Sequence, residues 1–148
     1  MNNLERADSI IPPALERAFV EQRSIVPGDE EALERLFRYL QRIRPMTSEI
    51  RAAVCELYGI ELTELVSRGR SYELSLARQI YCYLAHKHTR LSMTQVARTV
   101  GLTDHTTVRH AIRKIGKLAI TNPLLADDLD LLRLRICEKA LMRSKGAA

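Results

Sequence analysis

The sequence predicts an all-α protein, and three observations support this fold class. Apolar side chains recur at steps of three and four residues along most of the chain, which is the spacing of one helix face. No stretch alternates apolar and polar residues as a half-buried strand would, and Gly, Pro or Asn separates most of the periodic stretches. The 148 residues, 46% apolar and 28% charged, have the composition of one ordinary globular domain with an appendage.

Residues 1–46 are expected to form an N-terminal helical extension. Pro12 and Pro13 favour a helix start, because proline is tolerated in a first helical turn. A second helix is predicted over residues 30–44; it ends before Pro45, and Thr47 with Ser48 then offers a new N-cap. We therefore place a domain boundary at residues 45–47. The second helix carries an apolar stripe of Leu33, Leu36, Phe37, Leu40 and Ile43.

Residues 47–120 are expected to form one helical domain, and residues 121–148 a C-terminal helix with a short tail. The apolar periods predict helices over residues 48–58, 62–67, 74–88, 93–100, 104–121 and 123–142. The last of them has a plausible packing stripe of Leu125, Leu129, Leu132, Ile136 and Leu141.

The fourth and fifth of these helices have the order of a helix-turn-helix. Ser92 and Gln95 form a capping-box pattern at the start of the first, and Gly101 stops it as a left-handed C-cap would. Asp104 is a natural N-cap for the second, which in a helix-turn-helix enters the major groove of DNA. A plain αα-hairpin in a helical domain would have the same pattern, so these residues alone leave both interpretations open.

The helix predicted over 104–121 divides into two faces. One face is apolar and should pack on a core, while the other can reach a polyanion. The apolar face consists of Val108, Ala111, Ile112, Ile115, Leu118 and Ala119, and the polar face of Thr106, Arg109, Arg113 and Lys117.

The positive charge of the chain is unevenly placed. The formal net charge is +5, and residues 48–120 hold 11 basic and 6 acidic side chains, whereas the flanking segments nearly cancel. A phosphate-binding surface would require such an excess on the helix-turn-helix segment.

Cysteine usage and hydropathy predict a cytoplasmic protein, and binding to DNA would place it at the nucleoid. Cys55, Cys82 and Cys137 are odd in number and lie in helical apolar patterns, as buried thiols of a reducing compartment do. The charged start of the chain lacks the apolar core of a signal peptide, and no apolar run approaches the roughly 20 residues of a membrane span.

Taken together, these motifs resemble the C-terminal DNA-binding domain of the bacterial replication initiator DnaA, over about residues 54–118. The stretch Asp104-His105-Thr106-Thr107-Val108, followed by His110-Ala111 and Arg113-Lys114-Ile115, is specific to that family. Further matching segments are 54–60, 65–71, 77–80 and 83–85. The resemblance implies an all-α helix-turn-helix domain, here with extra N-terminal and C-terminal helices, that binds an A·T-containing nonamer of duplex DNA.

The resemblance also implies roles for individual residues. The positions of His105, Thr106 and Thr107 meet bases and phosphates in the major groove, and Asp104 contacts a base edge; imidazole and hydroxyl groups suit such contacts. Arg70 matches an arginine inserted into the adjacent minor groove, although by itself it would be a solvated loop cation. Arg78 and Gln79 match positions that clamp the DNA backbone. The remaining residues expected at the DNA are Met93, Thr94, Thr103, Arg109, His110, Arg113 and Lys114.

The sequence departs from the family in three places. Gly101-Leu102-Thr103 stands where the family has two glycines and a basic residue, so one basic contact is missing. Arg109 replaces an apolar residue and could add a guanine or phosphate contact. Ala97 stands where the short helix has glycine. These departures bear on which DNA sequence is bound rather than on DNA binding itself.

No enzyme, cofactor or metal site is predicted. Gly116-Lys117 lacks the other residues of a phosphate-binding loop, so we expect no bound nucleotide. The chain is also too short for the initiator's ATPase module. Cys82, His86 and His88 lack an evident fourth zinc ligand. His105 and His110 lack a nucleophile at a fitting position.

Two functions remain open from the sequence. The first is a sequence-specific binder of duplex DNA that acts by occupancy, as a transcriptional regulator or a competitor at replication-initiator sites. The second is a non-enzymatic adaptor that docks on proteins of the replication machinery. The apolar stripe on residues 30–44 would suit a protein partner or self-association, but we expect instead that it covers the domain's own core.

Overall fold

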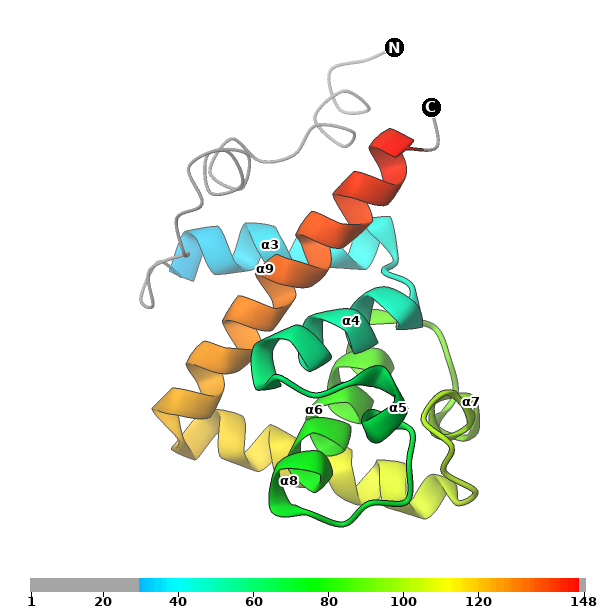
Figure 1. Cartoon of the computed structure of the whole chain (residues 1–148). Helices are drawn as coiled ribbons and strands as arrows, with labels where there is room; N and C mark the ends of the chain where they lie inside the picture. The colour runs from blue at the N-terminus through cyan, green and yellow to red at the C-terminus, as the bar shows by residue number, and fades with distance from the viewer. Residues whose placement is uncertain (1–29, 147–148) are drawn as a thin grey trace.

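The computed structural model describes residues 30–146, and within this range the chain is helical without strands, as the sequence predicts. Figure 1 shows a bundle of helices crossed by one long C-terminal helix. The helices are α3 Glu30–Ile43, α4 Thr47–Tyr58, α5 Leu62–Leu65, α6 Tyr72–His88, α7 Met93–Thr99, α8 His105–Thr121 and α9 Pro123–Gly146. The helix expected at Pro12 and Pro13 lies outside the described residues.

Helix α6 forms the centre of the core. It contacts α4, α5, α7 and α8, and its side chains Ile80, Tyr81 and Leu84 are fully buried. Helix α9 packs against α3, α4 and α8 and runs diagonally across the molecule from the end of α8 (Figure 1). Four residues of the stripe predicted for α9 are buried, with Leu132 and Ile136 fully enclosed, whereas Leu141 near its end is only partly buried. The domain is thus a layer of short helices around α6, with α9 laid over it.

Helix α4 begins one residue before the predicted start, and its cap is different. Met46, rather than Thr47 or Ser48, is the N-cap residue. The Met46 backbone N–H donates to Oε1 of Glu49 at 2.7 Å, and the other carboxylate oxygen of Glu49 accepts from Nε of Arg143 on α9 at 3.1 Å. The expected hydroxyl cap was wrong: Thr47 and Ser48 lie inside the first turn of α4, and Glu49, which Arg143 of α9 contacts, fixes the start of the helix by accepting from the Met46 amide.

The other helices also differ from the prediction, by one residue at one end of α3, α7 and α8 and by more in α5, α6 and α9. Helix α5 stops at Leu65 rather than Ser67, whose hydroxyl donates to the Glu64 carbonyl at 2.6 Å. Helix α6 begins at Tyr72 because Ser71 caps it, accepting from the Leu74 amide at 3.2 Å. Helix α9 continues four residues beyond the predicted end at position 142.

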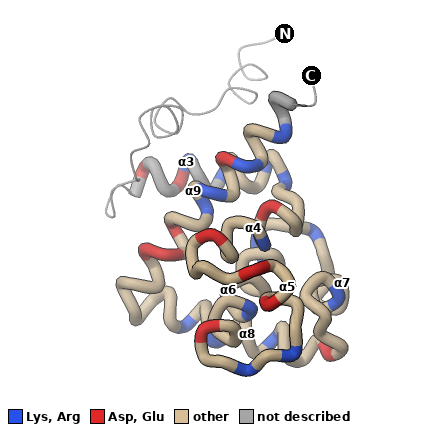
Figure 2. The backbone as a smooth tube through the Cα atoms, viewed as in Figure 1, with Lys and Arg blue, Asp and Glu red and all other residues tan. Residues whose placement is uncertain are grey.

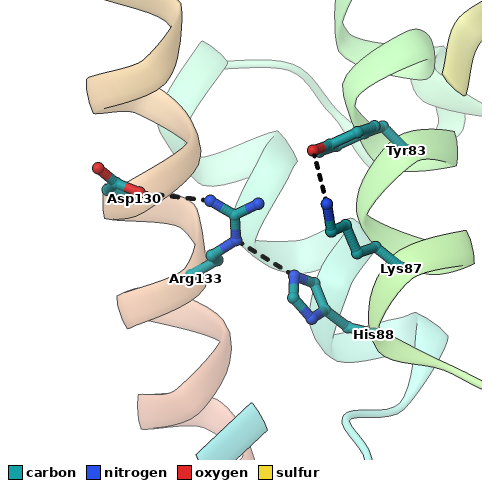
Figure 3. Close-up of polar contacts among 5 residues, drawn as sticks. All are labelled: Tyr83, Lys87, His88, Asp130 and Arg133. Atoms are coloured by element: carbon teal, nitrogen blue, oxygen red, sulfur yellow. Dashed lines mark hydrogen bonds and ion pairs between the residues drawn. The ribbon is translucent and has the colours of Figure 1, made fainter. Parts of the chain in front are cut away.

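A polar cluster joins α6 to α9 (Figure 3). Nε of Arg133 on α9 donates to Nε2 of His88 at 3.2 Å, and Nη1 of the same arginine pairs with Asp130 at 3.3 Å. Burial, and then the charges of Arg133 and Lys87, lower the pKa of His88 to about 3. The imidazole is therefore neutral, and it accepts a hydrogen bond from the arginine inside the fold.

Helix α3 shares the core of the following helices. Leu40 is fully buried, and Tyr39 and Ile43 pack against the same cluster. Of the predicted stripe, the side chains of Leu33, Leu36 and Phe37 lie outside the described residues. The division of the chain at residues 45–47 stays a prediction. Between residues 30 and 146, no helix combines the length and apolar character needed to cross a membrane.

Candidate nucleic-acid interface

Helices α7 and α8 form the helix-turn-helix predicted from the sequence. At the start of α7, the Gln95 amide donates to Oγ of Ser92 at 3.2 Å, and the Ser92 amide donates to Oε1 of Gln95 at 2.8 Å. Both halves of the predicted capping box are present, so two free amides of the first turn are satisfied. Val96 and Ala97 of α7 are buried.

The turn between the two helices depends on Gly101. Its φ of +70° is in the left-handed region, and the amides of Gly101 and Leu102 donate back to the carbonyls of Arg98 and Ala97 at 3.4 and 2.9 Å. This pattern is a Schellman motif, which confirms the predicted glycine stop. A Cβ at Gly101 would also lie 3.0 Å from the carbonyl oxygen of Val66, so the turn abuts the end of α5.

The first turn of α8 is capped and exposed. Oδ1 of Asp104 accepts from the Thr106 amide at 2.9 Å, which confirms Asp104 as the N-cap. This backbone hydrogen bond lowers the pKa of the Asp104 carboxyl group, and the nearby His105 adds to the effect. Thr103, Asp104, His105, Thr106 and Thr107 are all exposed. A fixed helix start thus presents short donor and acceptor side chains to solvent.

The two faces predicted for this helix are observed. Val108, Ala111 and Ile115 are buried against the core. The outward face is basic, and α8 contains no acidic residue. Figure 2 shows basic residues along α8 and on the loop before α6, whereas acidic residues lie mainly on the other helices. The exposed polar residues of α8 beyond its first turn include Arg109, His110, Arg113, Lys114 and Lys117.

A hollow of about 120 Å³ lies between α6 and α8. Gln79 and Thr107, which are far apart in the sequence, both line it, together with Ser75 and Leu102. Oε1 of Gln79 is buried and has no hydrogen-bond partner among the described residues. The fold therefore brings a predicted backbone-clamping residue of α6 to the start of the predicted recognition helix.

The segment between α5 and α6, residues 66–71, carries Arg70 and is called the arm segment below. The Arg70 side chain is exposed. Arg78, in contrast, is half-buried, and its guanidinium group is directed at the arm segment, where it donates to the carbonyls of Ser67 and Gly69. The resemblance predicts a DNA contact for both arginines, but the structure gives them different surroundings.

The remaining expected residues lie at the start of α7. Thr94 is exposed, while Met93 is partly buried against the core. Two polar residues near the interface were missed by the sequence analysis: Ser75 lines the hollow, and Ser67 organises the arm segment. Ser75 lies four residues before Gln79 on one helix, so helical spacing could have indicated it.

The cysteine and histidine pattern does not assemble a metal site in the described part of the chain. Residues 30–146 contain no group of three His, Cys, Asp or Glu side chains arranged to hold a metal ion. Cys82 is buried, and burial raises the pKa of its thiol to about 12. Its surroundings keep this thiol protonated, as expected for a core cysteine.

Comparison with known proteins agrees with this geometry. The family described as "Bacterial dnaA protein helix-turn-helix" matches residues 47–115. The chromosomal replication initiator protein DnaA of Cereibacter sphaeroides is 41% identical over 85 residues, covering 57% of this chain and 19% of that protein. The DnaA protein of Mesorhizobium japonicum is 33% identical over 124 residues, covering 84% of this chain and 25% of that protein.

A third relative is covered to a similar extent. The DnaA protein of Bartonella quintana is 37% identical over 111 residues, covering 75% of this chain and 22% of that protein. The chain thus spans between 19% and 25% of the length of these curated relatives. Residues 47–115 of the chain thus form a helix-turn-helix domain of the bacterial DnaA family.

Proposed function

We propose that this protein binds duplex DNA in a sequence-specific manner, with the first turn of α8 in the major groove and Arg70 in the adjacent minor groove. The observation that carries the proposal is the exposed, capped start of α8 next to a basic outward face. Hydroxyl and imidazole groups there can read base edges, and a threonine methyl group suits the methyl group of thymine.

The proposed contacts fall into two classes. Asp104, His105, Thr106 and Thr107 read bases, and Arg109 adds a base or phosphate contact one turn further along α8. Phosphate contacts fix the register of the protein on DNA. They are assigned to Gln79, Met93, Thr94, Thr103, His110, Arg113 and Lys114.

Binding without a described catalytic site suggests action by occupancy. On this proposal the protein regulates transcription or competes at replication-initiator sites, and its target is the A·T-containing nonamer that the family resemblance implies. The proposed division of the chain is an N-terminal extension over residues 1–46, the DNA-binding domain over 47–120 and a C-terminal helix and tail over 121–148. The proposed location is the cytoplasm, at the nucleoid.

Titration of labelled duplexes with the full chain tests the proposal. A duplex containing the nonamer and one with the same bases in scrambled order are titrated at two salt concentrations, followed by fluorescence anisotropy. We expect tighter binding to the nonamer at both, with affinity falling as salt rises. Equal, steeply salt-dependent binding to both duplexes would reject sequence recognition. Binding to neither would reject DNA as the partner and favour the adaptor function.

A further inference from the structure

The Arg78 guanidinium group is occupied by the chain segment that precedes α6. Nε donates to the Leu65 carbonyl at 2.7 Å, and Nη2 donates to the carbonyls of Ser67 and Glu64 at 2.7 and 3.2 Å. Nη1 donates to the Gly69 carbonyl at 2.5 Å. The fork of five N–H groups is thus directed at four backbone carbonyls, which include the end of α5.

Other contacts hold the arm segment in the same conformation. Oγ of Ser67 accepts from the Gly69 amide at 3.2 Å, and a Cβ at Gly69 would lie 2.9 Å from Cδ1 of Leu74. On the other side of Arg70, Ser71 is fixed as the N-cap of α6. The backbone of Arg70 is therefore held on both sides, although its side chain is exposed.

The arm segment also touches the helix-turn-helix. The carbonyl oxygen of Val66 is the atom that faces Gly101 at the turn between α7 and α8. The conformation of the arm segment therefore sets where Arg70 lies relative to α8. A minor-groove arginine must keep this register, because the two grooves that the protein would enter are fixed relative to each other on the duplex.

We propose that Arg78 is a positioning residue, which orders the arm segment so that Arg70 enters the minor groove in register with α8. This inference rests on the proposed DNA binding, and it differs from the phosphate contact that the family resemblance implies for Arg78. An arm segment that is already ordered in the free protein loses less conformational entropy when it binds DNA than a flexible one, so it binds more tightly.

The Arg78→Lys variant distinguishes the two roles. Lysine keeps the positive charge and remains a phosphate ligand, but its compact ammonium group cannot reproduce the planar fork that reaches four carbonyls. A phosphate contact would therefore largely survive in Arg78→Lys, whereas the order of the arm segment would not. Arg38→Lys is a matched control, since this exposed arginine on α3 lies far from α8 (Figure 1).

The test is a double-mutant cycle in the full chain. Wild type, Arg78→Lys, Arg70→Ala, the double variant and Arg38→Lys are titrated with the nonamer duplex and with duplexes in which single A·T pairs are replaced by G·C. We expect Arg70→Ala to lower nonamer affinity about 10-fold and to remove the A·T preference at the pair it faces. Arg78→Lys should remove the same preference, and it should cost nothing further in the Arg70→Ala background.

Amide hydrogen exchange of the free protein supplies a readout that needs no DNA. In Arg78→Lys, the hydrogen-bonded amides of Ser67 and Gly69 should exchange faster while those of the α8 core stay protected, which excludes general unfolding. Wild-type affinity for Arg78→Lys, or costs that add in the double variant, would overturn the positioning role and leave the proposed function intact. If the wild-type protein bound the nonamer and the substituted duplexes equally well, the proposed function would be overturned, and this inference with it.

Discussion

Replacing Gly101 with alanine should destabilise the protein more than the same replacement at Gly59. Both glycines have left-handed backbone, with φ of +70° and +62°, and alanine costs about 1–2 kcal/mol there. A Cβ at Gly101 would meet the Val66 carbonyl oxygen at 3.0 Å, whereas one at Gly59 has nothing within 4 Å. A backbone oxygen cannot rotate away, so relief requires a shift of the arm segment, and overpacking of this kind costs about 1–3 kcal/mol.

Urea unfolding followed by far-ultraviolet circular dichroism measures the difference. Gly59→Ala should lower the free energy of unfolding by about 1–2 kcal/mol, and Gly101→Ala by about 2–5 kcal/mol. Because the shift moves the arm segment relative to α8, Gly101→Ala should also weaken DNA binding, while Gly59→Ala should leave it unchanged. Equal losses of stability for the two variants would refute the reasoning from the Val66 contact.

Three further predictions concern pH, DNA contacts and capping. Burial holds the pKa of His88 at about 3 against an ordinary value of 6.5, so the unfolded chain binds the extra proton. The free energy of unfolding should keep the full contribution of neutral His88 above pH 6.5, and it should fall by up to about 1.4 kcal/mol per pH unit between pH 6.5 and about 3. His88→Gln should flatten this pH dependence, which unfolding curves at several pH values measure. In duplex titrations, Thr106→Ala should reduce discrimination at one base pair by about 1–3 kcal/mol, whereas Lys114→Ala should weaken binding to every sequence and reduce the salt slope by about 0.9. A result in which both variants affected all duplexes equally would contradict this division of roles. Ser92→Ala removes the N-cap of α7 and should cost about 1 kcal/mol in thermal unfolding; an unchanged transition would show that the cap contributes nothing.

Several helix ends that depend on local chemistry could be predicted from the sequence, although the Ser71 cap of α6 was missed. Ser92, Gly101 and Asp104 act as the predicted caps because each satisfies amides or carbonyls within a few residues of itself. The apolar stripes of α8 and α9 were predictable for the same reason, since helical spacing alone decides which face is buried. Local signals therefore identified the helix-turn-helix and its exposed residues.

Features that depend on distant partners could not be predicted in this way. The cap of α4 rests on Glu49, which Arg143 holds from α9, 94 residues further along the chain. The contacts of Arg78 depend on the path of the arm segment, which the sequence shows only as a loop. The resemblance predicts a DNA contact for Arg78 from residue type and position, but it could not show the backbone carbonyls that this side chain contacts within the protein.

The carbonyl contacts of two arginines bear on how charge should be counted. Residues 48–120 hold 11 basic side chains, but Arg51 donates to the Thr99 carbonyl at the end of α7, and Arg78 donates to the arm segment. Either would have to give up hydrogen bonds within the protein to meet a phosphate group. The number of counterions released from DNA on binding should therefore be smaller than the number of basic residues suggests. Part of the positive charge of this domain therefore stabilises the fold of the domain through hydrogen bonds to its backbone carbonyls.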